Sequence, residues 1–209
     1  MNIQDIIIRR RLFRKKEELL PGLLFHSEDP TNTLKFINKT DGATGKSKAI
    51  NLMYSIDNGA TWTTFNIAKD TASVTVPVQS KDILLRGVNT NGLSNLCANK
   101  NTDWNEGLGS FHIQPTKATS VRGSVQWIID CNNPTSTTPP PADMNTLQGG
   151  SLCGLFRDAV NIVDIDQFVI PYTQASYQLC RSMFIGCNGL TRVPRSLFAF
   201  LNTPDCTYL

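Results

Sequence analysis

The sequence predicts a mainly β protein with a helical arm at its N-terminus. From Leu23 to about Ile129, apolar residues alternate with polar ones at a period of two, which is typical of half-buried strands. The 209 residues include 14 Gly and 11 Pro, which favour turns over long helices. Apolar residues make up 40% of the chain and charged residues 18%, a composition that can form a hydrophobic core.

Residues 1–22 are predicted to form the arm, with a short helix at residues 2–18. Asn2 can cap this helix, Asp5 suits its positive N-terminal end, and Pro21-Gly22 ends it. Such a short helix is unstable alone in water and needs a surface to lie on. We expect that surface to be a larger assembly, although packing on the chain's own body is the alternative. The expected docking residues are Ile3, Ile6, Ile7, Arg9, Arg10, Arg11, Phe13 and Arg14.

The net charge of +3 lies entirely in this arm, which has six basic and three acidic residues. Basic and acidic residues balance in the rest of the chain, so the body has no field that would steer a nucleic acid or an acidic substrate. We therefore expect no nucleic-acid partner. No run of about 18 apolar residues predicts a membrane span, and no apolar segment follows the basic run in the way of a secretory signal.

Residues 23–131 are predicted to form an antiparallel β-sandwich of the immunoglobulin-like kind, with seven short strands. Asp57-Asn58-Gly59 tolerates positive φ angles and predicts a tight hairpin between two strands. The stretch Asn89–Gly109 is expected to be an exposed loop in which Trp104 packs on the core. The alternating residues are Leu34 and Phe36; Leu52, Tyr54 and Ile56; Val74, Val76 and Val78; Ile83 and Leu85; Phe111 and Ile113; and Val125, Trp127 and Ile129.

Residues 132–150 are expected to be a linker or long loop, since their first half is rich in Pro and Thr. Residues 151–209 then repeat an apolar pattern at an offset of 28, which is typical of a solenoid. Cys187 takes the slot of Ala159, so we expect it to pack rather than react. The predicted repeat core is Leu155, Phe156, Ala159, Ile162, Met183, Phe184, Cys187, Leu190 and Val193.

A third unit is expected to begin at Cys206, because Cys206-x-x-Leu209 matches Cys180-x-x-Met183. A solenoid generally needs about three units. We therefore expect the natural polypeptide to continue beyond Leu209.

The sequence predicts no catalytic residue, no cofactor and no metal site, so we expect the protein not to be an enzyme. It contains neither a phosphate-binding loop nor a Gly-x-Ser-x-Gly motif. The six cysteines lack zinc-site spacing and are expected to be free thiols. Asp158, Asp164 and Asp166 lack the other ligands of a calcium loop and are expected to be solvated.

Two motifs resemble the BspA-like leucine-rich-repeat proteins of Bacteroidetes and of their phages. Residues 180–194 read CRSMFIGCNGLTRVP, which is similar to the Met-Phe-x-Gly-Cys-x-x-Leu-Thr-x-x-Pro repeat of that family. Residues 54–62 read YSIDNGATW, which resembles the hairpin that precedes those repeats. The resemblance implies a receptor-facing module that begins a leucine-rich-repeat solenoid.

The resemblance together with the apparent lack of an export signal predicts a phage fibre or virion-attached adhesin, assembled in the host cytoplasm and located in the virion. Residues 1–22 would dock to the capsid, portal or tail, and the body would bind a host-surface glycan or protein. Because fibres are symmetric, we expect a trimer or a dimer. The alternative is a bacterial cell-surface adhesin with leucine-rich repeats, which would carry an export signal and disulfides.

Overall fold

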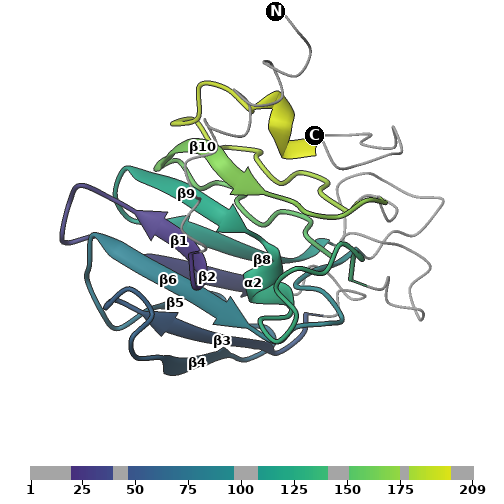
Figure 1. Ribbon diagram of the computed structural model, residues 1–209, viewed down its shortest axis with the longest axis horizontal. Helices are drawn as coiled ribbons and strands as arrows, with labels where there is room; N and C mark the ends of the chain where they lie inside the picture. The colour runs from purple at the N-terminus through teal and green to yellow at the C-terminus, as the bar shows by residue number, and fades with distance from the viewer. Residues whose placement is uncertain (1–19, 40–46, 97–107, 141–150, 175–178, 199–209) are drawn as a thin grey trace, which may run out of the picture.

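The alternation in the sequence becomes two stacked β-sheets in the computed structural model, which describes residues 20–39, 47–96, 108–140, 151–174 and 179–198. The six-stranded sheet contains, in spatial order, β10 (Ile162–Val169), β9 (Thr119–Ser124), β1 (Leu23–His26), β6 (Asp82–Gly87), β3 (Ile50–Ser55) and β4 (Thr63–Ile67). The four-stranded sheet contains β5 (Val74–Thr75), β2 (Leu34–Lys39), β8 (Leu108–Pro115) and β7 (Asn95–Leu96). Figure 1 shows the smaller sheet behind the larger one.

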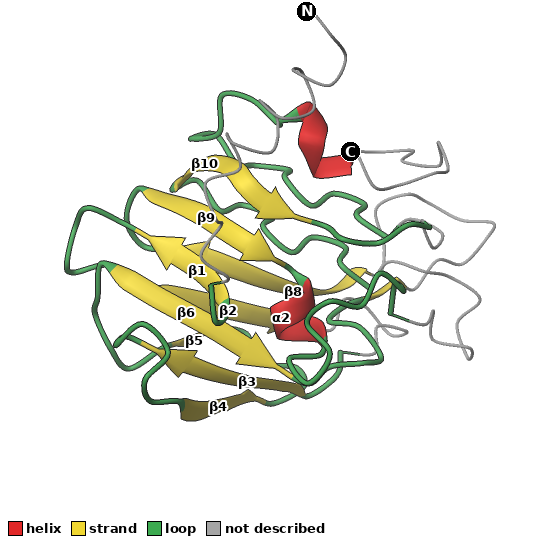
Figure 2. Cartoon of the chain, in the orientation of Figure 1, coloured by secondary structure: helices red, strands yellow, loops and turns green. Residues whose placement is uncertain are grey.

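The mainly β prediction is confirmed in the described residues. Strands and loops dominate, and the helical segments in the described ranges are the short α2 (Gln126–Ile129) and the 3-10 turn η1 (Arg195–Phe198) (Figure 2). No described helix has the length and apolar character needed to cross a membrane. The structure does not confirm an immunoglobulin-like topology, and no solenoid is detected in the part of the chain that it describes. The expected arm helix lies outside the described residues.

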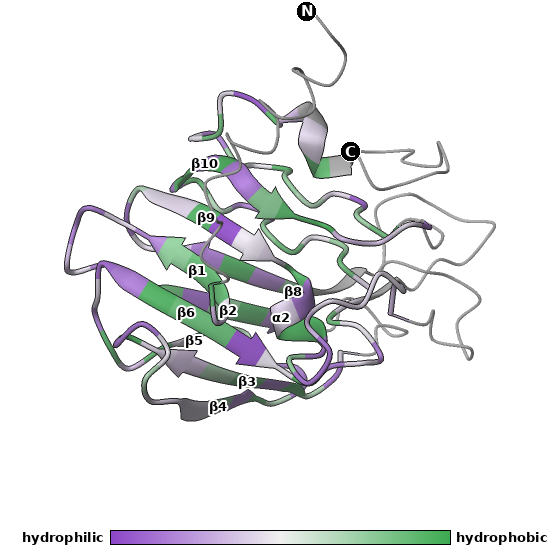
Figure 3. Ribbon diagram, viewed as in Figure 1, coloured by the Kyte–Doolittle hydropathy of each residue, from purple (hydrophilic) through white to green (hydrophobic). Residues whose placement is uncertain are grey.

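The strands follow the period-two rule because alternate side chains of a strand point to opposite faces. In β1, Leu23 and Phe25 are buried while Leu24 and His26 are half-buried. In β6, Ile83 and Leu85 face the core, and Figure 3 shows the apolar stretch in the middle of this strand. All described strand pairs are antiparallel except β10 with β9, which are parallel.

Aromatic rings join the sandwich to the segment that follows the expected linker. Phe25 of β1 meets Phe156 edge-on, with ring centroids 6.3 Å apart, and Phe156 meets Phe168 of β10 at 5.3 Å. Phe36 and Phe111 stack at 5.7 Å between β2 and β8. The buried cluster therefore includes residues from both sides of residues 132–150.

Four local predictions need correction. Residues 126–129 form α2 rather than a strand, because Val125, Ile128 and Ile129 fill the core at helical spacing and leave Trp127 half-exposed. The strand that was expected to reach Ile56 ends at Ser55, and Ile56 is 47% exposed.

The stretch Asn89–Gly109 is not wholly an exposed loop. Asn89 is 8% exposed, and its amide bonds the backbone of Asn51 and Ile128. Leu93 is buried, and β7 and the start of β8 lie in this stretch. Trp104 lies outside the described residues.

The hairpin predicted at Asp57-Asn58-Gly59 exists, with a longer connection than a tight turn. β3 and β4 pair from Ile50↔Ile67 to Tyr54↔Thr63, so residues 56–62 connect them. Asn58 and Gly59 have φ angles of 56° and 87°, as their residue types allow.

Candidate interaction site

The two copies of the sequence repeat form two segments that stack on each other in the structure. We call residues 151–165 the first unit and residues 179–193 the second unit. Both follow the same backbone path, since left-handed φ angles recur at Gly154 and Ser182, and again at Asp158 and Gly186. Each pair is separated by the 28-residue offset of the apolar pattern.

The turns inside each unit recur at the same offset. The Leu155 N–H donates to the Leu152 carbonyl at 3.2 Å, and its equivalent Met183 donates to Cys180 at 3.2 Å. Three further pairs of internal bonds, donated by Ala159 and Cys187, by Val160 and Asn188, and by Ile162 and Leu190, also match. A backbone repeat thus accompanies the side-chain repeat.

A row of backbone hydrogen bonds connects the first unit to the second. The N–H groups of alternate residues in the first unit point to carbonyls of the second unit, with N···O distances of 2.7 to 3.0 Å. The donors Leu152, Gly154, Phe156 and Asp158 meet the carbonyls of Leu179, Arg181, Met183 and Ile185. The spacing of two is that of a strand ladder, although neither segment forms a named strand.

The sandwich covers the opposite side of the first unit, where its carbonyls point. The Ser151 carbonyl accepts from the N–H groups of Leu93 and Ser94, and the Cys153 carbonyl accepts from Ser94 Oγ at 2.8 Å. The Leu155 carbonyl accepts from Ile113 N–H at 2.8 Å, and the Arg157 carbonyl accepts from Gln114 Nε2 at 3.0 Å. The sandwich therefore caps the acceptor side of the stack.

The predicted repeat core divides by depth. Leu155, Phe156, Ala159, Ile162, Met183 and Cys187 are buried. Phe184 and Leu190 are partly buried and pack against that cluster, whereas Val193 is 44% exposed and lies outside it. Phe184 stacks on Phe156 across the two units, with ring centroids 5.9 Å apart.

The cysteines of the stack serve packing rather than chemistry. Cys187 Sγ donates to the Phe156 carbonyl at 2.9 Å, and burial raises the pKa of Cys187 to about 11. Burial likewise raises the pKa of Cys153 to about 12. Both thiols stay protonated near neutral pH and are poor nucleophiles. Among the described residues, Cys131, Cys153 and Cys187 are free thiols.

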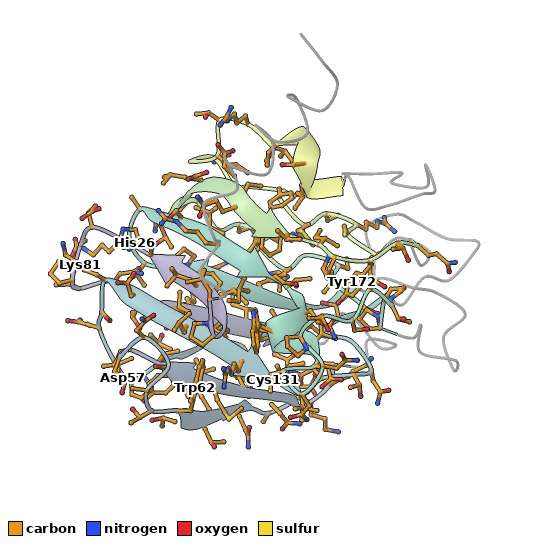
Figure 4. The ribbon with its side chains drawn as sticks, in the orientation of Figure 1. His26, Asp57, Trp62, Lys81, Cys131 and Tyr172 are labelled. Carbon is orange, nitrogen blue, oxygen red and sulfur yellow. The ribbon has the colours of Figure 1, made fainter. Side chains whose placement is uncertain are left out.

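A second feature is the point at which the predicted arm meets the sandwich. Arg86 of β6 lies between two indoles, with its guanidinium carbon 4.2 Å from the Trp62 ring centroid and 5.0 Å from that of Trp127. Arg86 Nε also donates to the Pro21 carbonyl. Figure 4 labels Trp62 near Asp57, and both residues belong to the connection from β3 to β4.

This junction holds the end of the arm in place, and sequence reasoning missed it. The eight expected docking residues, Ile3, Ile6, Ile7, Arg9, Arg10, Arg11, Phe13 and Arg14, lie outside the described residues. The only sequence signal at the junction is a lone Arg within an apolar strand. Its tryptophan partners lie far from it along the chain.

A third feature is a groove of about 460 Å³ beside His26, at the edge where Figure 4 labels His26 and Lys81. His26 contacts Asp82 through Nδ1 at 2.7 Å and Glu28 through Nε2 at 3.3 Å. Hydrogen bonds from His26 and Lys81 lower the pKa of Glu28. The acidic groups Glu28, Asp29 and Asp82 near this groove therefore lie beside the basic groups His26, Lys81 and Lys117.

No group of His, Cys, Asp and Glu in the described part of the chain could hold a metal ion. Asp158 and Asp166 are exposed and Asp164 is half-buried; Asp166 pairs with Arg192.

Comparison of the chain with protein-family models, with curated proteins and with solved structures finds no match.

Proposed function

We propose that this chain is a non-catalytic structural subunit of a phage virion, a fibre or adhesin that presents a rigid β body for binding to the host surface. The observation that supports this role best is the stack of two units, 28 residues apart in sequence, on the edge of a β-sandwich. Stacked repeats build extended surfaces that suit recognition. The resemblance of residues 54–62 and 180–194 to BspA-like proteins supports the same role.

Attachment would use residues 1–22. Arg86, which lies between Trp62 and Trp127, donates to the Pro21 carbonyl and so ties residue 21 to the larger sheet. Apolar contacts of Ile3, Ile6, Ile7 and Phe13 would supply affinity at about 25 cal/mol per Å² buried, less the cost of ordering the arm. Arg9, Arg10 and Arg11 would set the orientation against acidic groups of a capsid, portal or tail protein.

Deletion of residues 2–18 tests the attachment step. The deleted chain should keep the thermal unfolding curve of the body, while its copy number in purified particles falls to background. A matched control is a chain in which Arg9, Arg10 and Arg11 are replaced by Lys, which keeps the charge and should keep most of the occupancy. Full occupancy of the deleted chain would refute docking through the arm.

The binding step needs a separate measurement. Particles and the isolated chain should both adsorb to host cells, and the isolated chain should compete with particles for the same sites. Sedimentation of the isolated chain should give a trimer or a dimer. If the chain is found on the bacterial surface and not in particles, the cell-surface adhesin is correct instead.

A further inference from the structure

The larger sheet ends at β4, whose outer edge is open in the part of the chain that the structure describes. There β4 pairs with β3 alone, and Figure 1 shows it at the lower edge of the sheet. Residues 60–68, which contain β4, carry no charged side chain. An open edge of this kind is a template on which another strand can pair.

The other edge strands that the structure describes are protected against such pairing. β5 and β7 have two residues each. β10 carries Asp164 and Asp166, its register with β9 is irregular, and Asp166 pairs with Arg192 of the second unit. Short length, charge and irregular pairing are the usual defences of an edge strand. β4 has none of them, since it is five residues long, uncharged and regularly paired with β3.

The hydrogen bonds of β3 show which backbone groups of β4 face outward. The Asn51 N–H donates to Asn89 Oδ1 and the Asn51 carbonyl accepts from Asn89 Nδ2, both at 2.9 Å, so these backbone groups point toward β6, which Asn89 follows. Backbone groups of successive residues point to opposite sides of a strand, so the next residue of β3 bonds Phe65, its partner in β4. The N–H and carbonyl groups of Thr64 and Asn66 therefore point away from β3.

A second copy of β4, related to the first by a two-fold axis at Phe65, satisfies all four of these groups. Thr64 then lies opposite Asn66 of the second copy, and each such pair exchanges two hydrogen bonds. A two-fold contact also brings each stretch of chain against its own copy. Because residues 60–68 are uncharged, this contact opposes no like charges along β4.

The side chain of Phe65 favours the same arrangement. Its ring is partly buried and lies with its centroid 5.7 Å from the Phe36 ring and 6.3 Å from the Tyr54 ring. In the two-fold pair, Phe65 lies opposite its own copy in the closer type of antiparallel pair, with Cα atoms about 4.5 Å apart. The two rings then meet and continue the aromatic cluster from one copy into the other.

We propose that β4 is a dimerisation edge, on which a second copy of this chain pairs antiparallel about Phe65 and joins the two larger sheets into one. Two-fold dimers are the commonest form of self-association, and their contacts are self-complementary in this way. The inference rests on residues 63–67 alone, and it holds whether or not the chain belongs to a virion.

Sedimentation and amide exchange of the 209-residue chain test the proposal. A contact through one short strand is small, so the dimer should be weak. Sedimentation from about 10 μM to about 1 mM should show a monomer–dimer equilibrium. Over the same range the amides of Thr64 and Asn66 should exchange severalfold more slowly as the dimer forms. The amide of Phe65, which bonds β3, should change little.

Two charge variants test the register. Thr64 and Asn66 are exposed, so the fold should tolerate charged side chains there. Thr64→Lys with Asn66→Lys places lysine opposite lysine in both pairs and should raise the dissociation constant of the dimer about tenfold or more. The matched control is Thr64→Lys with Asn66→Glu, which places lysine opposite glutamate in the antiparallel pair and should keep the dimer. Thermal unfolding of dilute samples reports that both variants fold.

Two results would overturn the proposal. One is a chain that stays monomeric throughout the concentration range, which would leave the edge to a strand of another protein. The other is a dimer that the two lysines leave unchanged while the variant remains folded, which would place the contact on another face of the molecule.

Discussion

The first and second units follow the same backbone path but differ in how they are covered. The first unit lies between the sandwich and the second unit, and both Leu155 and Phe156 are 0% exposed. In the second unit Met183 is also fully buried, but Phe184 is only partly buried. Ile165 is buried, whereas its equivalent Val193 is 44% exposed. Equal sequence patterns thus produce equal turns, while neighbours in the stack decide the burial.

The largest loss of stability is expected when either of the two equivalent phenylalanines is replaced by alanine. Phe156→Ala removes a ring that contacts Phe25, Phe168 and Phe184, and it should lower the free energy of unfolding by about 3–5 kcal/mol. Phe184→Ala should cost about 1–2 kcal/mol, because less apolar surface is lost. Urea denaturation of both variants measures the two losses in unfolding free energy. Equal losses would contradict the different burial of the two rings.

The next test concerns the cap that the sandwich places on the first unit. Ser94 is 4% exposed; its Oγ donates to the Cys153 carbonyl at 2.8 Å and accepts from Phe111 N–H at 2.9 Å. Ser94→Ala leaves both groups without that partner and should cost about 2–3 kcal/mol. Ser120→Ala is the matched control, since Ser120 is 8% exposed and its Oγ has no partner among the described residues.

Ser120→Ala should change the unfolding free energy by less than about 0.5 kcal/mol. The two serines are similarly buried, so the difference between the variants isolates the hydrogen bonds from the loss of the hydroxyl volume. If the Ser94 variant were no less stable than the Ser120 variant, the cap would contribute nothing to stability.

A smaller effect is expected where the two units touch through a glycine. Gly186 has a φ of 76°, and a Cβ there would lie 2.3 Å from Asp158 Oδ1. Gly186→Ala should cost about 2 kcal/mol through backbone strain and this contact. Asp158→Gly, at the equivalent position with φ of 57°, should cost less than about 1 kcal/mol. Differential scanning calorimetry of both variants distinguishes the positions, and similar losses would argue against the close contact.

The smallest effect is expected from acid, and it should lie outside both units. Hydrogen bonds from Ser55 and Thr61 lower the pKa of Asp57 to about 2. A lowered pKa in the folded state stabilises it above the ordinary carboxyl pKa of about 4, and this contribution is lost as pH falls from about 4 to about 2. Asp57→Asn should flatten this part of the stability profile, measured by urea denaturation at several pH values. An unchanged acid profile would contradict the assignment.

Some of the fold follows from local sequence alone. The alternation at Leu34 and Phe36, at Leu52 and Tyr54, and at Ile83 and Leu85 predicts strands that the structure contains. The same rule misplaced residues 125–129, because their mostly apolar residues suit a strand and a short helix equally well. It also missed β10, whose residues were assigned to the repeat pattern alone.

The candidate site was predictable only in part. The offset of 28 and the slot shared by Ala159 and Cys187 are visible in the sequence. In the structure these two residues are buried at equivalent backbone positions of the two units. The position of Arg86 between Trp62 and Trp127 was not predictable, because partners in that cluster come from a loop, a strand and a helix. No local pattern encodes such a meeting.

Local sequence is enough to predict the β character, the hairpin at Asp57-Asn58-Gly59 and the offset of the two units, because alternation, turn preference and repetition can be read along the chain. Two features depend on the folded chain: β10 joins the larger sheet, and the first unit is capped by Leu93, Ser94, Ile113 and Gln114. Those contacts join residues about 40 to 60 positions apart. Their energies depend on burial and on hydrogen-bond direction, which the folded chain alone establishes.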